Sequence, residues 1–339
     1  MKISDRASDR ISNLSVLCVL LVIVQHIPIG PLFTDHIGIF TGLAVPVFFV
    51  ISGFFFASHA ESSSWWRDGL RKRVHTLLIP YLIANVLWYL ADSALSGRTI
   101  GIHGFCVGLG LDLRARPADG PLWYMRGLMI FMVLAGPLYG LIRRARGMAV
   151  SVVLILLLGA MTCRQVATTD SEGLAEFLKY GFNVQGLFCF TVGMVIRRYE
   201  MKIKVPSTGH FLLLLLAVLS LAVYFVGGFR GIDGLMVVAM MAVAYLLWVV
   251  MPHVGAHNVF QRNLFAIYLY HVPVIACVQY AYRTFVRSAS GMSTFEWVAL
   301  NGVQFLLCIG FPILVSEAMK KAEPKRRENL LRWKVIRKA

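Results

Sequence analysis

Two histidines in apolar stretches of this sequence have the chemistry of proton transfer. His26 follows the apolar run from Leu14 to Val24, and His271 lies inside FAIYLYHVPV. A neutral imidazole can take a proton from a hydroxyl at neutral pH, so each is a candidate general base. A helix beginning at Asn13 carries His26 roughly 20 Å into a hydrocarbon layer about 30 Å thick. An ionisable group at that depth predicts a functional site with a partner; for both histidines the structural alternative is packing between helices.

A second group of polar side chains lies in PLWYMRGL, residues 121–128. Trp123, Tyr124 and Arg126 can each donate a hydrogen bond to an oxyanion that develops in a water-poor site. Arg126 is expected about 7 to 8 Å, and His26 about 10 Å, below the same membrane boundary, so they share a depth. Trp123 and Tyr124 could instead stack on a sugar or anchor the helix at the interface, and Arg126 could extend to the headgroups.

The elements that carry these residues are apolar stretches long enough to cross a membrane. The chain is 58% hydrophobic and 15% charged, with a mean hydropathy of +0.70, which predicts a polytopic, all-α membrane protein rather than a soluble domain. Ser52 and Gly53 indicate a close helix contact in the second stretch. About ten spans are predicted, at 13–29, 38–58, 74–94, 121–142, 148–165, 181–197, 209–227, 232–252, 263–283 and 296–317.

The distribution of positive charge predicts the orientation. With ten spans and a cytoplasmic start, 24 Lys and Arg residues fall on the cytoplasmic side and 8 on the other. This bias predicts that both termini are cytoplasmic. It also explains the net charge of +16 without nucleic-acid binding. The first span is expected to be retained, because no small-residue cleavage site follows it.

Little of the chain is left for other domains. The predicted division is a membrane domain over 1–319 and a basic amphipathic tail over 320–339 on the anionic inner leaflet. The longest extramembrane piece, 95–120, includes Gly101, Gly104, Gly108 and Gly110 and is predicted to be a lid or re-entrant loop. Six scattered cysteines without ligand spacing favour neither a disulfide nor a metal site.

Several of these segments together resemble the integral-membrane acyltransferases of the acyltransferase-3 type. The resemblance covers nearly the whole chain. Its order and spacing, rather than any single motif, make it specific. It is carried by RISNLSVLCVLLVIVQH, PVFFVISGFFF, LRKRVHTLLIPYLIAN, PLWYMRGLMIF, FCFTVGMVIRRYE and RNLFAIYLYHVPV.

This resemblance implies an acyl-CoA donor, most simply acetyl-CoA, that enters from the cytoplasm, and a carbohydrate acceptor in an envelope glycan or glycolipid. It places the family histidine on His26. The basic loop that could contact CoA phosphates falls on Arg71, Lys72 and Arg73, and the Pro-Tyr pair ends on Tyr81. The rival interpretation of the basic loop is a positive-inside signal alone. The implied location is the inner cell membrane.

One position departs from the family pattern, which usually has an arginine eleven residues before the histidine. Here that residue is Ser15, so Arg10 or Arg126 could substitute for it, or activity could be lost. A transporter or flippase, and a non-catalytic membrane scaffold, therefore stay as alternatives to an O-acyltransferase. Transfer through a covalent acyl-enzyme and direct transfer from the thioester both remain open.

Overall fold

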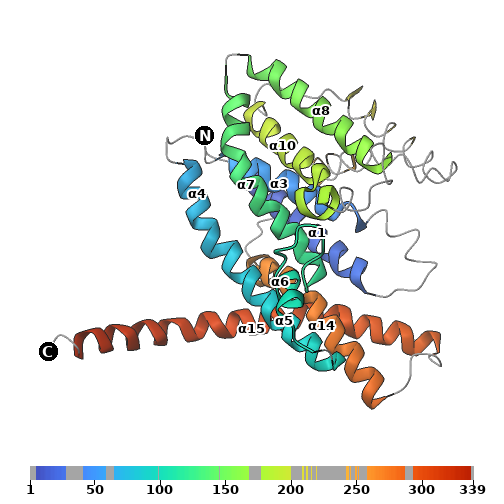
Figure 1. The fold of residues 1–339 in the computed structure, drawn as a ribbon, viewed down its shortest axis with the longest axis vertical. Helices are drawn as coiled ribbons and strands as arrows, with labels where there is room; N and C mark the ends of the chain where they lie inside the picture. Colours follow the sequence, from blue (N-terminus) through green and yellow to red (C-terminus); the bar gives the residue numbers. More distant parts are fainter. Residues whose placement is uncertain are drawn as a thin grey trace.

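The computed structural model describes residues 5–27, 41–58, 65–97, 99–144, 146–167, 177–199, 258–286 and 293–336, and single residues between 208 and 251. Every regular element in this part of the chain is a helix, which confirms the predicted all-α class (Figure 1). The helices lie against one another as a bundle, and α15 projects from it toward the C-terminus (Figure 1).

Eight of the ten predicted spans coincide with described helices. The predicted spans at 209–227 and 232–252 lie mostly outside the described residues. The elements that make up the main helices are α1 (Asp5–His26), α3 (Ala44–Ser58), α4 (Trp65–Arg73), η1 (Val74–Leu78), α5 (Ile79–Ser96), α7 (Trp123–Ile142), α8 (Gly147–Ala167), α10 (Val184–Tyr199), α14 (Leu264–Phe285) and α15 (Thr294–Ile336). The short ones are α6 (Ile102–Gly108), η2 (Gly120–Leu122), η3 (Phe177–Phe182) and α13 (Val259–Arg262).

Five segments are long and apolar enough to cross a membrane within the described residues. They are Ser8–His26, Trp65–Ser96, Gly120–Ile142, Leu264–Phe285 and Thr294–Ala322. Two shorter apolar helices, Ala44–Ser58 and Gly147–Thr162, accompany them. The structure therefore supports a membrane protein with several spans.

Helices α3 and α10 cross at two glycines, as expected for Gly53. A Cβ atom on Gly53 would collide with the Phe190 backbone, and one on Gly193 with the Val50 backbone. Without a hydrophobic driving force between helices in lipid, such small residues allow the backbones to approach closely. The crossing sets the position of Phe48 and Phe49 on α3 relative to the rest of the bundle.

The segment between α5 and α7 folds back onto the bundle. Its short helix α6 packs on α5, where the rings of Phe105 and Tyr89 lie 5.6 Å apart. The glycine-rich sequence has a packing reason, because a Cβ on Gly104 or Gly108 would press into the Tyr89 side chain. This segment is therefore a packed cover at the end of the bundle that holds His26.

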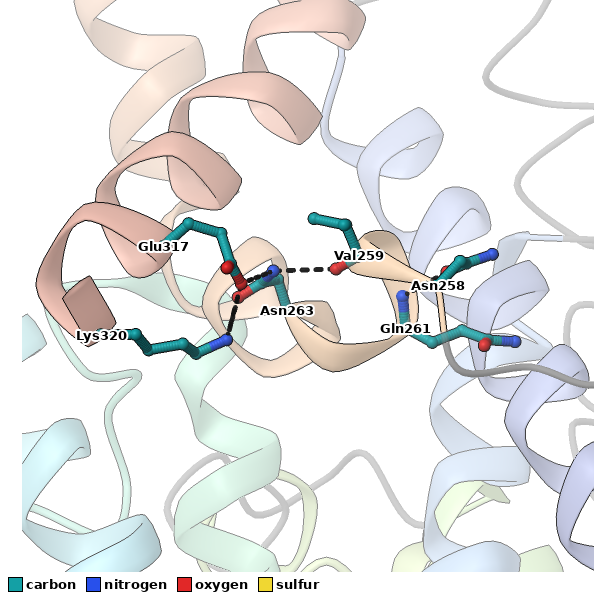
Figure 2. Close-up of polar contacts among 6 residues, drawn as sticks. All are labelled: Asn258, Val259, Gln261, Asn263, Glu317 and Lys320. Atoms are coloured by element: carbon teal, nitrogen blue, oxygen red, sulfur yellow. Dashed lines mark hydrogen bonds and ion pairs between the residues drawn. The ribbon is translucent and has the colours of Figure 1, made fainter.

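Polar contacts join the helices at the opposite end. The Asn263 amide donates to a Glu317 carboxylate oxygen at 2.8 Å, and Lys320 donates to both Asn263 (2.8 Å) and Glu317 (2.9 Å) (Figure 2). Gln261 also donates to the Asn13 side chain, 2.9 Å away. These bonds fix the start of α14 against α15 and α1. The tail predicted over 320–339 continues α15 as one helix to Ile336.

Candidate active site

The two candidate histidines, 245 residues apart in sequence, lie against each other. The ring centroids of His26 on α1 and His271 on α14 are 5.1 Å apart in an edge-on arrangement. His271 is 1% exposed, whereas His26 is half-buried. The partner expected for a deep histidine is therefore another histidine.

Hydrogen bonds define which ring nitrogen can act as a base. Nδ1 of His26 lies 2.9 Å from the Val22 carbonyl oxygen, and Nδ1 of His271 lies 2.6 Å from that of Tyr268. A carbonyl oxygen only accepts, so each Nδ1 carries the hydrogen and donates it. In a neutral ring the lone pair is then on Nε2. Nε2 of His271 has no hydrogen-bond partner among the described residues.

A row of aromatic rings continues from the histidine pair across the bundle. The Tyr268 ring lies 5.8 Å from His271 and 5.8 Å from Tyr124. The Tyr124 hydroxyl is 3.1 Å from the Ser52 hydroxyl, and Tyr268 donates to the Pro121 carbonyl oxygen at 2.6 Å. Of the two aromatic residues predicted for the site, Tyr124 is therefore the one that is connected to the histidines, through the Tyr268 ring.

A cavity of about 500 Å³ lies on one side of this row. Apolar side chains of α1, α3, η1, α7 and α14 make most of its wall. Its polar lining consists of Ser15, Ser52, Arg73, Tyr124 and Tyr268. The cavity thus extends from the Arg73 guanidinium to Tyr124 and Tyr268, whose rings continue to the histidine pair. Its volume is in the range of ordinary small-molecule sites.

The structure divides the basic cluster that was predicted to bind donor phosphates. Arg73 is half-buried and lines the cavity, whereas Arg71 and Lys72 are exposed. Tyr81 is buried elsewhere, with its hydroxyl donating to the Leu109 carbonyl oxygen at 3.1 Å. Arg73 is therefore the member of the predicted donor-binding group that faces the cavity.

Arg126 is buried at the histidine end of the bundle, but its guanidinium binds the covering segment. Its terminal nitrogens donate to the carbonyl oxygens of Gly110 (3.0 Å), Asp112 (3.0 Å) and Ala115 (2.9 Å). These three charge-assisted hydrogen bonds hold the segment between α6 and η2 against α7. A role as oxyanion donor stays a prediction for Arg126.

Trp123 is turned away from Tyr124, although the two are neighbours in sequence. Its ring lies 6.3 Å from Phe49 and lines a smaller pocket. Phe49 in turn packs on Tyr124 with ring centroids 4.6 Å apart. The two aromatic residues of the predicted site therefore face different spaces.

Asp119, which precedes the PLWYMR motif, was not predicted as a site residue. Its side chain is 1% exposed, and neither carboxyl oxygen has a hydrogen-bond partner among the described residues. Its backbone N–H donates to the Asn85 side chain at 3.2 Å. Burial raises the pKa of the Asp119 carboxyl from 3.8 to about 8. The only sequence signal was an acidic residue at the start of the fourth span.

This carboxyl predicts a pH-dependent stability. The folded chain keeps the proton up to about pH 8, whereas the unfolded chain releases it near pH 4, so stability falls as pH rises between these values. The loss is on the order of a few kcal/mol. Asp119→Asn should remove this component. Melting temperatures of both proteins in detergent from pH 4.5 to 8.5 provide the measurement, and parallel curves for the two would contradict the assignment.

Comparison with known protein families identifies the family of the chain. A family model described as an acyltransferase domain, of the acyltransferase-3 type, matches residues 10–316. No curated protein and no solved structure matches the chain.

Proposed function

Because the chain belongs to the acyltransferase-3 family of membrane acyltransferases, we propose that it is an O-acyltransferase. Its donor is an acyl-CoA, in the first place acetyl-CoA, and its acceptor is a carbohydrate hydroxyl of an envelope glycan or glycolipid. The observation that supports this proposal is the contact of His26 with His271, which places two imidazole rings beside the aromatic row of the 500 Å³ cavity.

His26 is the general base in this proposal. Its Nε2 takes the proton of the acceptor hydroxyl while the hydroxyl oxygen attacks the thioester carbonyl carbon. The tetrahedral intermediate then collapses to the ester, the carbon–sulfur bond breaks, and the thiolate leaves and takes up a proton. His26 is preferred over His271 because it is half-buried, whereas His271 is almost completely enclosed.

The cavity suggests how the donor is held. Arg73 provides a cation for CoA phosphates where η1 begins. On α1 the cavity reaches Val19, which is two helical turns, or roughly 10 Å, from His26. The Tyr124 hydroxyl lines the same space and would donate to the oxyanion by turning from the Phe48 carbonyl oxygen, 3.4 Å away.

The topology is part of the proposal: ten spans in the inner cell membrane, with both termini in the cytoplasm. Asn263 and Lys320 lie with Asn13 at the end of α1 away from His26, so the donor would enter from that positive-inside end. Reporter fusions at Arg144 and at the C-terminus should be cytoplasmic, and one at Asp119 external. An external C-terminus would overturn the model.

The direct test combines two measurements. Envelope glycans and glycolipids from cells with and without the protein are compared by mass spectrometry, and an ester should be missing from the second set. Purified protein should also release free CoA from acyl-CoA. A transporter or a scaffold would leave acyl-CoA intact, so absence of CoA release together with unchanged glycans would refute the enzyme.

A further inference from the structure

We infer that a small pocket at the His26 end of the bundle binds one sugar ring of the acceptor. The pocket has a volume of about 150 Å³, and its polar lining consists of Gln25, Trp123, Asn183 and Gln185. This inference rests on the proposed function, because it identifies where the hydroxyl-bearing substrate of that reaction sits.

The pocket and the 500 Å³ cavity lie on opposite sides of one aromatic partition. On α3, Phe48 lines the cavity and Phe49 lines the pocket. On α7, Tyr124 lines the cavity and Trp123 lines the pocket. Neighbouring residues of two helices therefore separate the two spaces, which gives donor and acceptor separate sites.

The pocket lining has the chemistry of carbohydrate recognition. The side-chain amides of Gln25 and Gln185 can both donate and accept, which matches hydroxyl groups that do the same. The Trp123 ring offers an apolar face to the C–H side of a sugar. At about 30 Å³ per liquid water molecule, the volume corresponds to about five waters, which suits a single ring rather than a CoA nucleotide.

The side of the pocket formed by the start of α10 has a rigid backbone. Asn183 has a φ of 45°, in the left-handed region that asparagine tolerates better than most residues. Its side-chain oxygen accepts from the Gly186 N–H and so caps the first turn of α10. A Cβ on Gly186 would collide with that oxygen and with the Phe49 ring. The Asn183 amide is thus held in place before any ligand arrives.

Gln25 on α1 connects the pocket to the proposed general base. Gln25 lines the pocket and directly precedes His26, so the two side chains lie at nearly the same depth. A sugar held by Gln25 would present a neighbouring hydroxyl toward the histidine. The pocket thus orients the acceptor, and His26 removes its proton.

The test measures binding apart from chemistry. The probe is the glycan fraction from cells that lack the protein, titrated into purified protein without acyl-CoA. Each lost amide contact should weaken binding about three- to tenfold, and Gln25→Leu with Gln185→Leu at least about tenfold. Gln261→Leu is the matched control, because it makes the same chemical change at the opposite end, and it should bind like the wild type.

Two outcomes would overturn the inference: a wild type that does not bind the fraction, or a double variant that binds it as tightly as the wild type. Size-exclusion profiles and melting temperatures identify any variant that is misfolded, in which case the single variants decide. CoA release from acyl-CoA is measured in parallel. If the wild type binds glycan but releases no CoA, and the envelope glycans are unchanged without the protein, the proposed function fails while the pocket assignment stands.

Discussion

His26→Gln should reduce ester transfer by roughly 10²- to 10⁴-fold, the usual contribution of a general base. Glutamine is similar in size and forms hydrogen bonds, but it cannot accept a proton at neutral pH. The described bundle is held by many other contacts, including the α3–α10 crossing, so the variant should insert and fold. Transfer is measured with purified protein, radiolabelled acetyl-CoA and the glycan fraction.

His271→Gln is the matched comparison for His26→Gln. It changes the same chemical group in the same ring pair, 5.1 Å away, but at a site that is 1% exposed. A smaller loss than in His26→Gln is expected, because His271 would orient the base rather than contact the hydroxyl. Near-normal transfer by His26→Gln with loss in His271→Gln would reverse the two roles.

The sequence was sufficient to predict most of the described helices. Apolar length locates a span, and a rise of 1.5 Å per residue converts position into depth. For that reason eight predicted spans coincide with described helices, and Gly53 was correctly assigned to a helix contact. Both results depend on local sequence alone.

Lateral neighbours could not be predicted in this way. His26 and Arg126 were expected at the same depth, but the ring beside His26 belongs to His271, and Arg126 binds carbonyl groups of the segment around Gly110. Depth fixes the position of a residue along the membrane normal only. Its position in the membrane plane depends on which helices pack together. The same limit explains why Trp123 and Tyr124 were taken as one site although they face different spaces.

The packing also gives a physical account of Ser15, where the family pattern has an arginine. Ser15 lines the 500 Å³ cavity, and Arg73 lines it as well. The Ser15 hydroxyl donates to the Ile11 carbonyl oxygen of its own helix at 2.8 Å, so it adds no charge to the cavity. Arg126, considered as a substitute, is engaged with the covering segment. We propose that Arg73 supplies the cation that meets the donor.

Arg73→Gln should therefore raise the apparent KM for acyl-CoA by roughly 10- to 100-fold, the usual effect of removing a charge-assisted contact, with a smaller change in kcat. The increase should shrink at high salt, because the wild type also loses part of its attraction for the phosphates. The double variant Arg71→Gln and Lys72→Gln is the matched control: it removes two charges that are exposed rather than facing the cavity, and its KM should change only a few-fold. An equal increase in both proteins would show that the loop acts through its net charge and would remove Arg73 from the donor site.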